Sequence, residues 1–369
     1  MPRNSLAVAL LALVSWGLPF RDLAPSDPAI SRTDFARLMT DLSEPEGYFD
    51  TDNFISNEAA YLRVLPPLRR LGVRGGVYVG VGPDQNYSYI AQLEPRLAII
   101  VDIRRQNALE HLYFKALFEL SHNRVEYLER LFGRPLGGGP ATPERAPIRS
   151  ILEAADRASR DPAFSARKIS EALAAIRAWR LPLEEGDLHT IEYIARAFST
   201  AGPDLKFTSF NREPRPHHPT YRQLLEETDG AGLQCSYLAQ EDRFRIVKRL
   251  HGENRILPLV GDFAGAHAFS AVGRELRRRG LELTCFYASN VEFYLFRGDR
   301  WPAYLRNLQA LPRARSAYVI RTYANSWQSH PAQIPGYYMT TVLQPLEGLF
   351  ASGADASYWD LVTRGCILR

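Results

Sequence analysis

The sequence predicts an α/β protein built on a doubly wound, mostly parallel sheet of the Rossmann-like type, with a helical insertion after the second strand. Residues 75–107 show a strand, a glycine turn, a helix, a second strand and a terminal aspartate in succession. Strand-length apolar runs alternate with amphipathic stretches again over residues 256–322. Such alternation favours parallel βαβ units, and the helical stretch between the two regions is then an insertion.

The first of these units begins with residues 77–79, which are β-branched or aromatic and precede Gly80 and Gly82. A buried strand is therefore expected to end in a turn that needs positive φ or a close backbone approach. An apolar stripe predicts a helix over residues 87–93, and residues 97–101 form a continuous apolar run that is typical of a central parallel strand.

Asp102 ends the second strand, about 20 residues past the glycines, where folds of this kind bind a ribose hydroxyl. The third glycine of the dinucleotide fingerprint is replaced by Gln85. Asp84 places a carboxylate beside the helix N-terminus, where it competes with a phosphate for the same amides. The turn alone fits a packing turn and a ligand loop equally well, and Asp102 favours the ligand loop.

Composition excludes several classes of function. The chain has 369 residues, with 46% hydrophobic and 23% charged residues and a net charge of +4, as in an ordinary soluble globular protein. Its 45 basic residues are scattered, so nucleic-acid binding is not predicted. Cys235, Cys285 and Cys366 lie far apart, and neither a disulfide framework nor a metal site follows from them.

The N-terminus leaves the location of the protein open. Arg3 precedes an apolar run over residues 6–18, which is short for a membrane span and right for the core of a signal peptide. No small-residue cleavage site follows the run. A secretory signal or uncleaved anchor, which allows membrane association, and a plain hydrophobic leader of a cytoplasmic protein are both consistent with it.

Four regions organise the chain: a leader over residues 1–30, the first half of the Rossmann-like domain over 31–135, a helical insertion with a long loop over 136–250, and the second half over 251–369. Helices are expected where apolar residues recur at helical spacing. These stretches are residues 31–43, 57–71, 87–93, 107–132, 148–179, 187–200, 236–250, 266–279 and 301–311. Glycine and proline break the chain at residues 133–147, and residues 202–232 form a long polar loop.

Three further strands are predicted in the second half, over residues 256–260, 281–287 and 316–322, and residues 336–346 supply a final antiparallel strand. Because ligands of open parallel sheets bind at the carboxyl ends of the strands, polar residues there are candidates for one shared cleft. These candidates are Gly80, Gly82, Asp84, Asp102, Arg104, Gly261, Asp262, Ser289, Asn290 and Glu292.

The polar and aromatic segment over residues 44–58 has two interpretations. It is either an ordered connector, capped by Ser56 into the next helix, or a segment that folds over a ligand with Asp52, Asn53 or Asn57.

The strand ends resemble those of the class I S-adenosylmethionine-dependent methyltransferase fold. The resemblance implies that Gly80 and Gly82 form the cofactor loop, that Asp102 contacts the ribose and that Asp262 meets the adenine. It also implies that a polar motif after the fourth strand, here Asn290 with Glu292, lies at the reacting centre. The family usually carries an acid just before the glycines; Tyr78 and Val79 stand there in this sequence, and Asp84 is the candidate substitute.

A narrower similarity covers residues 77–133. The segment DIRRQNALEHLYFKALFELSHNRVEYLERLFG is similar to the region after the second strand in the 3-amino-3-carboxypropyl transferases of betaine-lipid synthesis. Those enzymes also use S-adenosylmethionine and also carry a helical insertion. This similarity implies aminocarboxypropyl transfer as an alternative to methyl transfer.

The function expected first is an S-adenosylmethionine-dependent transferase that acts on a small molecule or a lipid headgroup, with methyl transfer ahead of aminocarboxypropyl transfer. Glu292 is the candidate base, Asn290 its orienting partner and Tyr287 an aromatic wall. A salt bridge at a helix start is the competing interpretation of Glu292. If residues 6–18 export the chain, a non-catalytic or repurposed Rossmann-like binding protein is the alternative. The sequence does not determine the oligomeric state.

Overall fold

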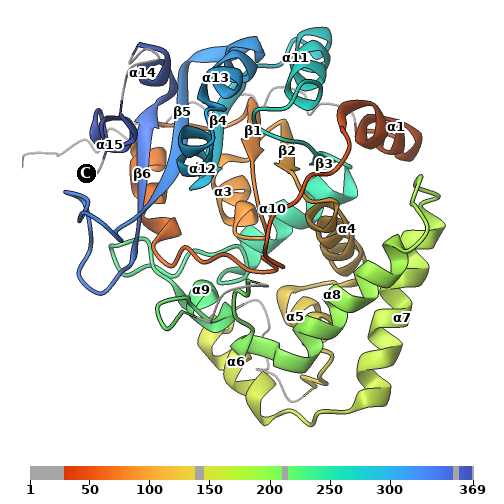
Figure 1. Cartoon of the computed structure of the whole chain (residues 1–369). Coiled ribbons are helices and arrows are strands. Elements are labelled where there is room, and N and C mark those ends of the chain that lie inside the picture. The colour runs from red at the N-terminus through yellow and green to blue at the C-terminus, as the bar shows by residue number, and fades with distance from the viewer. Residues whose placement is uncertain (1–28, 138–144, 210–214, 352–356, 368–369) are drawn as a thin grey trace, which may run out of the picture.

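A computed structural model describes residues 29–137, 145–209, 215–351 and 357–367 (Figure 1). The apolar run over residues 6–18 lies outside these ranges. No helix within them is both long enough and apolar enough to cross a bilayer.

The core of the molecule is one six-stranded sheet with the order β3-β2-β1-β4-β5-β6. The strands are β1 (Val77–Gly80), β2 (Leu97–Asp102), β3 (Ile256–Val260), β4 (Leu283–Ser289), β5 (Arg313–Ala324) and β6 (Met339–Pro345). Neighbouring strands from β3 through β5 pair in parallel, and β6 pairs antiparallel with β5. The predicted α/β class, the mostly parallel sheet and the final antiparallel strand are confirmed.

Two groups of helices lie around this sheet (Figure 1). The first group contains α3 (Asn86–Leu93), α4 (Arg105–Leu120) and α10 (Glu241–Gly252); α10 contacts both α3 and α4, and α4 packs on β2 and β3. The second group contains α1 (Arg32–Leu42), α11 (Ala268–Arg279) and α13 (Trp301–Ala310), in which α11 contacts both other helices. Short helices α2 (Leu65–Arg70), α12 (Val291–Arg297), α14 (Leu346–Ala351) and α15 (Tyr358–Thr363) complete the Rossmann-like part.

The helical insertion lies between β2 and β3, below the sheet in Figure 1. It comprises α5 (Arg124–Phe132), α6 (Ile148–Arg157), α7 (Pro162–Ala178), α8 (Asp187–Ala201), the 3-10 helix Gly202–Asp204 and α9 (Tyr221–Glu226). Its helices α7 and α8 pack on α4, so the insertion shares a hydrophobic core with the sheet.

Four predicted helices differ from the observed ones, and a capping residue explains the difference for two of them. The helix predicted over 107–132 is split, since Asn123 accepts hydrogen bonds from the amides of Val125 and Glu126 and begins α5. The stretch 148–179 is divided by the cap Asp161, which is followed by Pro162.

Residues 57–71 form only the 3-10 helix Tyr61–Val64 and α2, and the helix expected from 236 starts five residues later, at Glu241. The predicted loop over 202–232 contains α9, which begins with a capping box of Thr220 and Gln223.

Candidate functional site

A cavity of about 770 Å³ opens where the parallel strands end. Its walls include residues at the carboxyl ends of β1 to β5, around the point between β1 and β4 where the strand order reverses. Most of the residues predicted from the sequence lie together in its lining: Gly82, Asp102, Arg104, Gly261, Asp262, Ser289 and Asn290. The other predicted residues, Gly80, Asp84, Tyr287 and Glu292, do not line it.

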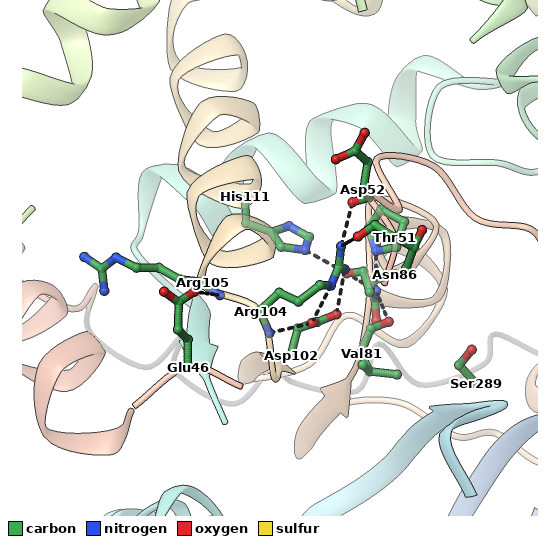
Figure 2. A network of polar contacts seen from close by, with 12 residues as sticks. Glu46, Thr51, Asp52, Val81, Asn86, Asp102, Arg104, Arg105, His111 and Ser289 are labelled. Carbon is green, nitrogen blue, oxygen red and sulfur yellow. Dashed lines mark hydrogen bonds and ion pairs between the residues drawn. The ribbon is translucent and has the colours of Figure 1, made fainter. Parts of the chain in front are cut away.

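The turn after β1 presents backbone to this cavity because Asn86 holds its carbonyls on the opposite side (Figure 2). The Nδ2 atom of Asn86 donates to the carbonyl oxygens of Val81, Gly82 and Pro83 at 2.9, 3.1 and 2.7 Å. The C=O and N–H of a trans peptide point in opposite directions, so the amide of Gly82 faces away from Asn86. Gly82 has φ +81°, which favours glycine, and a Cβ atom at this position would lie 3.5 Å from Nε2 of Gln85 and 3.7 Å from Nδ2 of Asn53.

His111 supports the same turn from α4. Its Nε2 lies 2.9 Å from the carbonyl oxygen of Gly82, and its Nδ1 lies 2.6 Å from the hydroxyl of Tyr87. The carbonyl can only accept, so Nε2 carries the proton and Nδ1 accepts from Tyr87. Burial lowers the pKa of His111 to about 4, so the ring is neutral near pH 7.

Gly80 serves packing rather than contact with a ligand. A Cβ atom at this position would lie 2.1 Å from Oδ1 of Asn86 and 2.6 Å from the hydroxyl of Tyr78. Tyr78 itself donates to Oδ1 of Asn86 at 2.7 Å. Tyr78, two residues before Gly80, therefore orients the side chain that shapes the turn.

Asp102 and Arg104 form a buried ion pair at the end of β2 (Figure 2). Oδ1 of Asp102 accepts from the backbone amide and the Nε of Arg104 at 2.9 and 3.1 Å, and Oδ2 accepts from Nη2 at 3.1 Å. A carboxylate has about four acceptor positions, so one position on Oδ2 is left for a further donor. Asp102 lines the cavity and is able to accept from a ribose hydroxyl.

The segment over residues 44–58 folds along the cavity and is tied to this ion pair. Nη1 of Arg104 donates to the carbonyl oxygens of Thr51 and Asp52 at 3.1 and 2.6 Å. Asn53 and Asn57 line the cavity, whereas the carboxylate of Asp52 accepts from the hydroxyl of Tyr193 outside it. The segment therefore forms part of the cavity wall, as the ligand-covering interpretation requires.

Glu58 is a cavity residue that the sequence reasoning missed. Its side chain is buried, and its carboxylate accepts from the hydroxyls of Tyr287 at 2.7 Å, of Thr322 at 2.7 Å and of Ser289. Within the described ranges, no cation pairs with it. Burial raises the pKa of Glu58, and the hydroxyl donors oppose this rise only in part. The sequence signal was its place at the end of residues 44–58, but nothing in the pattern marks which acid of that segment is buried.

Tyr287 and Ser289 reach Glu58 from the end of β4. The hydroxyl of Tyr287 also accepts from Nε2 of Gln85 at 3.0 Å. Tyr287, which was predicted to present its ring to the site, is therefore a buried hydrogen-bonding residue instead. Ser289 lines the cavity with φ +53°, a conformation that is uncommon for residues other than glycine. Strained backbone of this kind is concentrated at functional sites.

Glu292 does not line the cavity. It forms a salt bridge, as the competing interpretation of this residue expected. Its Oε2 and Oε1 accept from Nε and Nη2 of Arg321 at 2.6 and 3.0 Å, and Oε1 also accepts from the hydroxyl of Tyr304 at 2.8 Å. Both partners of this pair are almost fully buried. Because Glu292 does not line the cavity and its carboxylate is occupied by Arg321 and Tyr304, its predicted role as the base is disfavoured.

Asp84 points into the protein rather than into the cavity. Its Oδ2 accepts from the hydroxyls of Tyr221 and Tyr237 at 2.5 and 2.8 Å, so the carboxylate joins the insertion to the turn after β1. Burial raises its pKa to about 6. It does not replace the acid that methyltransferases carry before the glycines.

Asp262 and Asn290 are two further polar residues of the cavity lining. Asp262 accepts from Nη2 of Arg300 at 2.6 Å and from the amide of Ala264 at 2.9 Å. Asn290 is the residue before α12 and lies beside Ser289, with 3.5 Å between the Ser289 hydroxyl and Oδ1 of Asn290. Among the described residues, no three histidine, cysteine, aspartate or glutamate side chains are placed to hold a metal ion.

Comparison with protein families gives one match. A family model described as "Domain of unknown function (DUF7790)" matches residues 53–134 and 168–355. The chain belongs to the DUF7790 family. A comparison with curated proteins finds no match.

In this DUF7790 chain the matched ranges contain all six strands and most of the polar cavity residues, among them Glu58, Gly82, Asp102, Asp262 and Asn290. Tyr48, Phe49 and Tyr358, which are aromatic residues of the cavity, fall outside the matched ranges.

Proposed function

We propose that this protein is an S-adenosylmethionine-dependent transferase, most simply a methyltransferase, that acts on a small molecule or a lipid headgroup. The observation that carries this proposal is the cavity at the switch point, in which the glycine turn after β1 and an acid at the end of β2 lie together. A nucleoside binds at this place in doubly wound sheets.

The residues present fit the nucleoside part of this cofactor. Asp102 lines the cavity and retains one acceptor position, as a ribose hydroxyl needs, and Gly82 adds no side chain of its own to the turn. Asp262, at the end of β3, lines the same cavity at the place where the resemblance puts the adenine. The missing third glycine is consistent with a cofactor that has no pyrophosphate.

S-adenosylmethionine supplies, when bound, an activated methyl group whose bond to sulfur breaks as the bond to the acceptor forms. The chain then has to position the acceptor, exclude water and take up a proton if the acceptor carries one. Glu58 fits the proton-accepting role better than Glu292, because it lines the cavity and has hydroxyl partners instead of a guanidinium. Its raised pKa brings proton uptake closer to neutral pH.

The narrower similarity to aminocarboxypropyl transferases adds little to this choice. The residues that carry it after position 104 form α4 and α5, whose side chains are mostly buried in the hydrophobic core. A similarly packed helix accounts for the pattern without a shared reaction. Methyl transfer therefore stays ahead of aminocarboxypropyl transfer.

Calorimetric titration with S-adenosylmethionine and S-adenosylhomocysteine tests the proposal. We expect the wild type to bind both ligands. We expect Asp102→Asn to weaken both by at least about tenfold, because a hydrogen bond to a charged group is lost. Glu282→Gln, an exposed acid that does not line the cavity, should leave both affinities unchanged.

Absence of binding by folded wild-type protein at millimolar ligand would reject the transferase proposal. The alternative of an exported, non-catalytic binding protein would then gain weight, and mass determination of the mature N-terminus in the source cells would test it.

A further inference from the structure

The outer part of the cavity carries a row of five aromatic rings, here called the aromatic wall: Phe49, Phe293, Tyr294, Tyr323 and Tyr358. Successive ring centroids along this row lie 5.3, 5.5, 5.6 and 6.1 Å apart, in the order Phe49, Tyr294, Phe293, Tyr358, Tyr323. The rings come from residues 44–58, α12, α15 and β5, so the row exists only in the folded chain. All five line the cavity.

Two further aromatic side chains stand at the same cavity in contact with solvent. Trp327 is 89% exposed and Tyr48 is 76% exposed, and both belong to the lining. A ligand that covers large exposed aromatic side chains gains binding free energy. Such side chains beside a cavity therefore indicate a binding surface. Rings also favour other rings at centroid separations of about 4.5–7 Å.

The charges of the cavity lining are not balanced. The guanidinium groups of Arg104 and Arg300 are paired with Asp102 and Asp262. Arg297 is exposed, and its guanidinium lies 5.2 Å from the centre of the Phe293 ring in the aromatic wall. In the described part of the chain, no carboxylate pairs with Arg297. A stacked guanidinium keeps its edge N–H groups available for a planar anion.

We propose that the acceptor of this transferase is a flat aromatic molecule that carries an acidic group, and this proposal rests on the proposed function for its reaction. The ring of the acceptor lies against the aromatic wall, and its anionic group is bound by Arg297. A hydroxyl or amine on the ring then points inward to Glu58, which accepts its proton. An aliphatic anion would pair with Arg297 but would not stack on the aromatic rings. A neutral aromatic compound would stack on the rings but would leave Arg297 without an anionic partner.

Binding of three probes separates these possibilities. The probes are 1-hydroxy-2-naphthoate, which is flat and anionic, 1-naphthol, which is flat and neutral, and decanoate, which is anionic and aliphatic. Calorimetry of the full chain with each probe, with and without S-adenosylhomocysteine, gives the affinities. We expect 1-hydroxy-2-naphthoate to bind at least about tenfold more tightly than either other probe.

Two variants test the two halves of the site. Arg297→Gln should reduce the affinity for 1-hydroxy-2-naphthoate by about tenfold and leave 1-naphthol unchanged, while Arg306→Gln, an exposed arginine outside the cavity, should change neither. Tyr294→Leu should weaken both naphthalene probes and spare decanoate. Its control is Leu71→Ala, which truncates an exposed apolar side chain that does not line the cavity.

Equal affinity for decanoate and 1-hydroxy-2-naphthoate would overturn the aromatic part of the proposal, and an unchanged affinity in Arg297→Gln would overturn the anion subsite. The cofactor titration is a separate measurement. If S-adenosylmethionine binds and the aromatic acid does not, the acceptor class is wrong. If the aromatic acid binds and the cofactor does not, the site stands and the transferase function fails.

Discussion

Glu58 and Glu292 are both buried glutamates near the end of β4, and their partners give them different chemistry. Glu292 balances the guanidinium of Arg321, whereas Glu58 accepts only from hydroxyl groups and borders the cavity. Desolvation by burial is the main reason why the pKa of Glu58 is raised. The partners and the place of each side chain in the fold, more than its position in the sequence, therefore favour Glu58 as the candidate base.

Glu58→Gln should retain S-adenosylmethionine binding and lose methyl transfer by about 100-fold or more, because positioning remains and proton uptake does not. The pH–rate profile adds a sharper readout. In the wild type the ionised form of Glu58 accumulates as pH rises through its raised pKa, so the rate should rise with pH on the acid side. A variant that keeps this acid limb would assign it to another group.

Asp84→Asn should change how stability depends on pH. The pKa of Asp84 is raised from 3.8 to about 6, so its stabilising contribution is complete below pH 4 and is lost as pH rises toward 6. The shift corresponds to about 3 kcal/mol. The free energy of unfolding of the wild type should therefore fall, relative to the variant, by up to that amount between pH 4 and pH 7. Urea unfolding at both pH values measures the difference, and parallel pH dependence of the two proteins would contradict it.

At the scale of elements, the position of residues 44–58 depends on the side chain of Arg104, which follows β2. Arg104 joins Asp102 to the carbonyl oxygens of Thr51 and Asp52 (Figure 2). Glu58 anchors the end of the same segment to β4 and β5. The segment has no helix or strand of its own, so its position rests on these tertiary contacts. It is expected to open more easily than the sheet beneath it.

Arg104→Gln should loosen this segment without unfolding the sheet. Loss of the bonds to Thr51 and Asp52 is expected to raise the rate of proteolytic cleavage within residues 44–58 by about tenfold or more. Limited proteolysis with mass analysis of the fragments measures this rate. Arg37→Gln, an exposed arginine of α1, serves as the control, and equal cleavage of the two variants would show that Arg104 does not hold the segment.

At the scale of the whole molecule, the cavity joins parts that are far apart in the sequence. Its lining draws on residues 48–58, the ends of five strands, and four residues of the insertion: Phe207, Ser209, Arg215 and His218. A bound ligand should therefore protect backbone amides of residues 44–58, the turn after β1 and α12 together from hydrogen exchange. Exchange in α7, which lies away from the cavity, should not change (Figure 1). Protection confined to one of the three segments would indicate a different binding site.

Strands were more predictable than helix boundaries. Residues 97–101 and 256–260 are uninterrupted apolar runs, and both form buried parallel strands with almost the predicted ends, β2 inside the sheet and β3 at its edge. The helix expected over 107–132 carries apolar residues at helical spacing on both sides of its break, so periodicity did not reveal that Asn123 caps a new helix. Local capping competed with the longer pattern and determined the boundary.

The sequence by itself determined the α/β class, the alternation of strands and helices that favours a parallel sheet, and the polar residues at the strand ends. These features follow from periodicity and turn chemistry within short stretches. Only the tertiary structure decided which polar residues face the cavity. Asp102 and Glu58 border it, whereas Asp84 and Glu292 turn to tyrosine and arginine partners from distant segments. A carboxylate is directed by the donors that reach it, and those donors are brought near only when the chain folds.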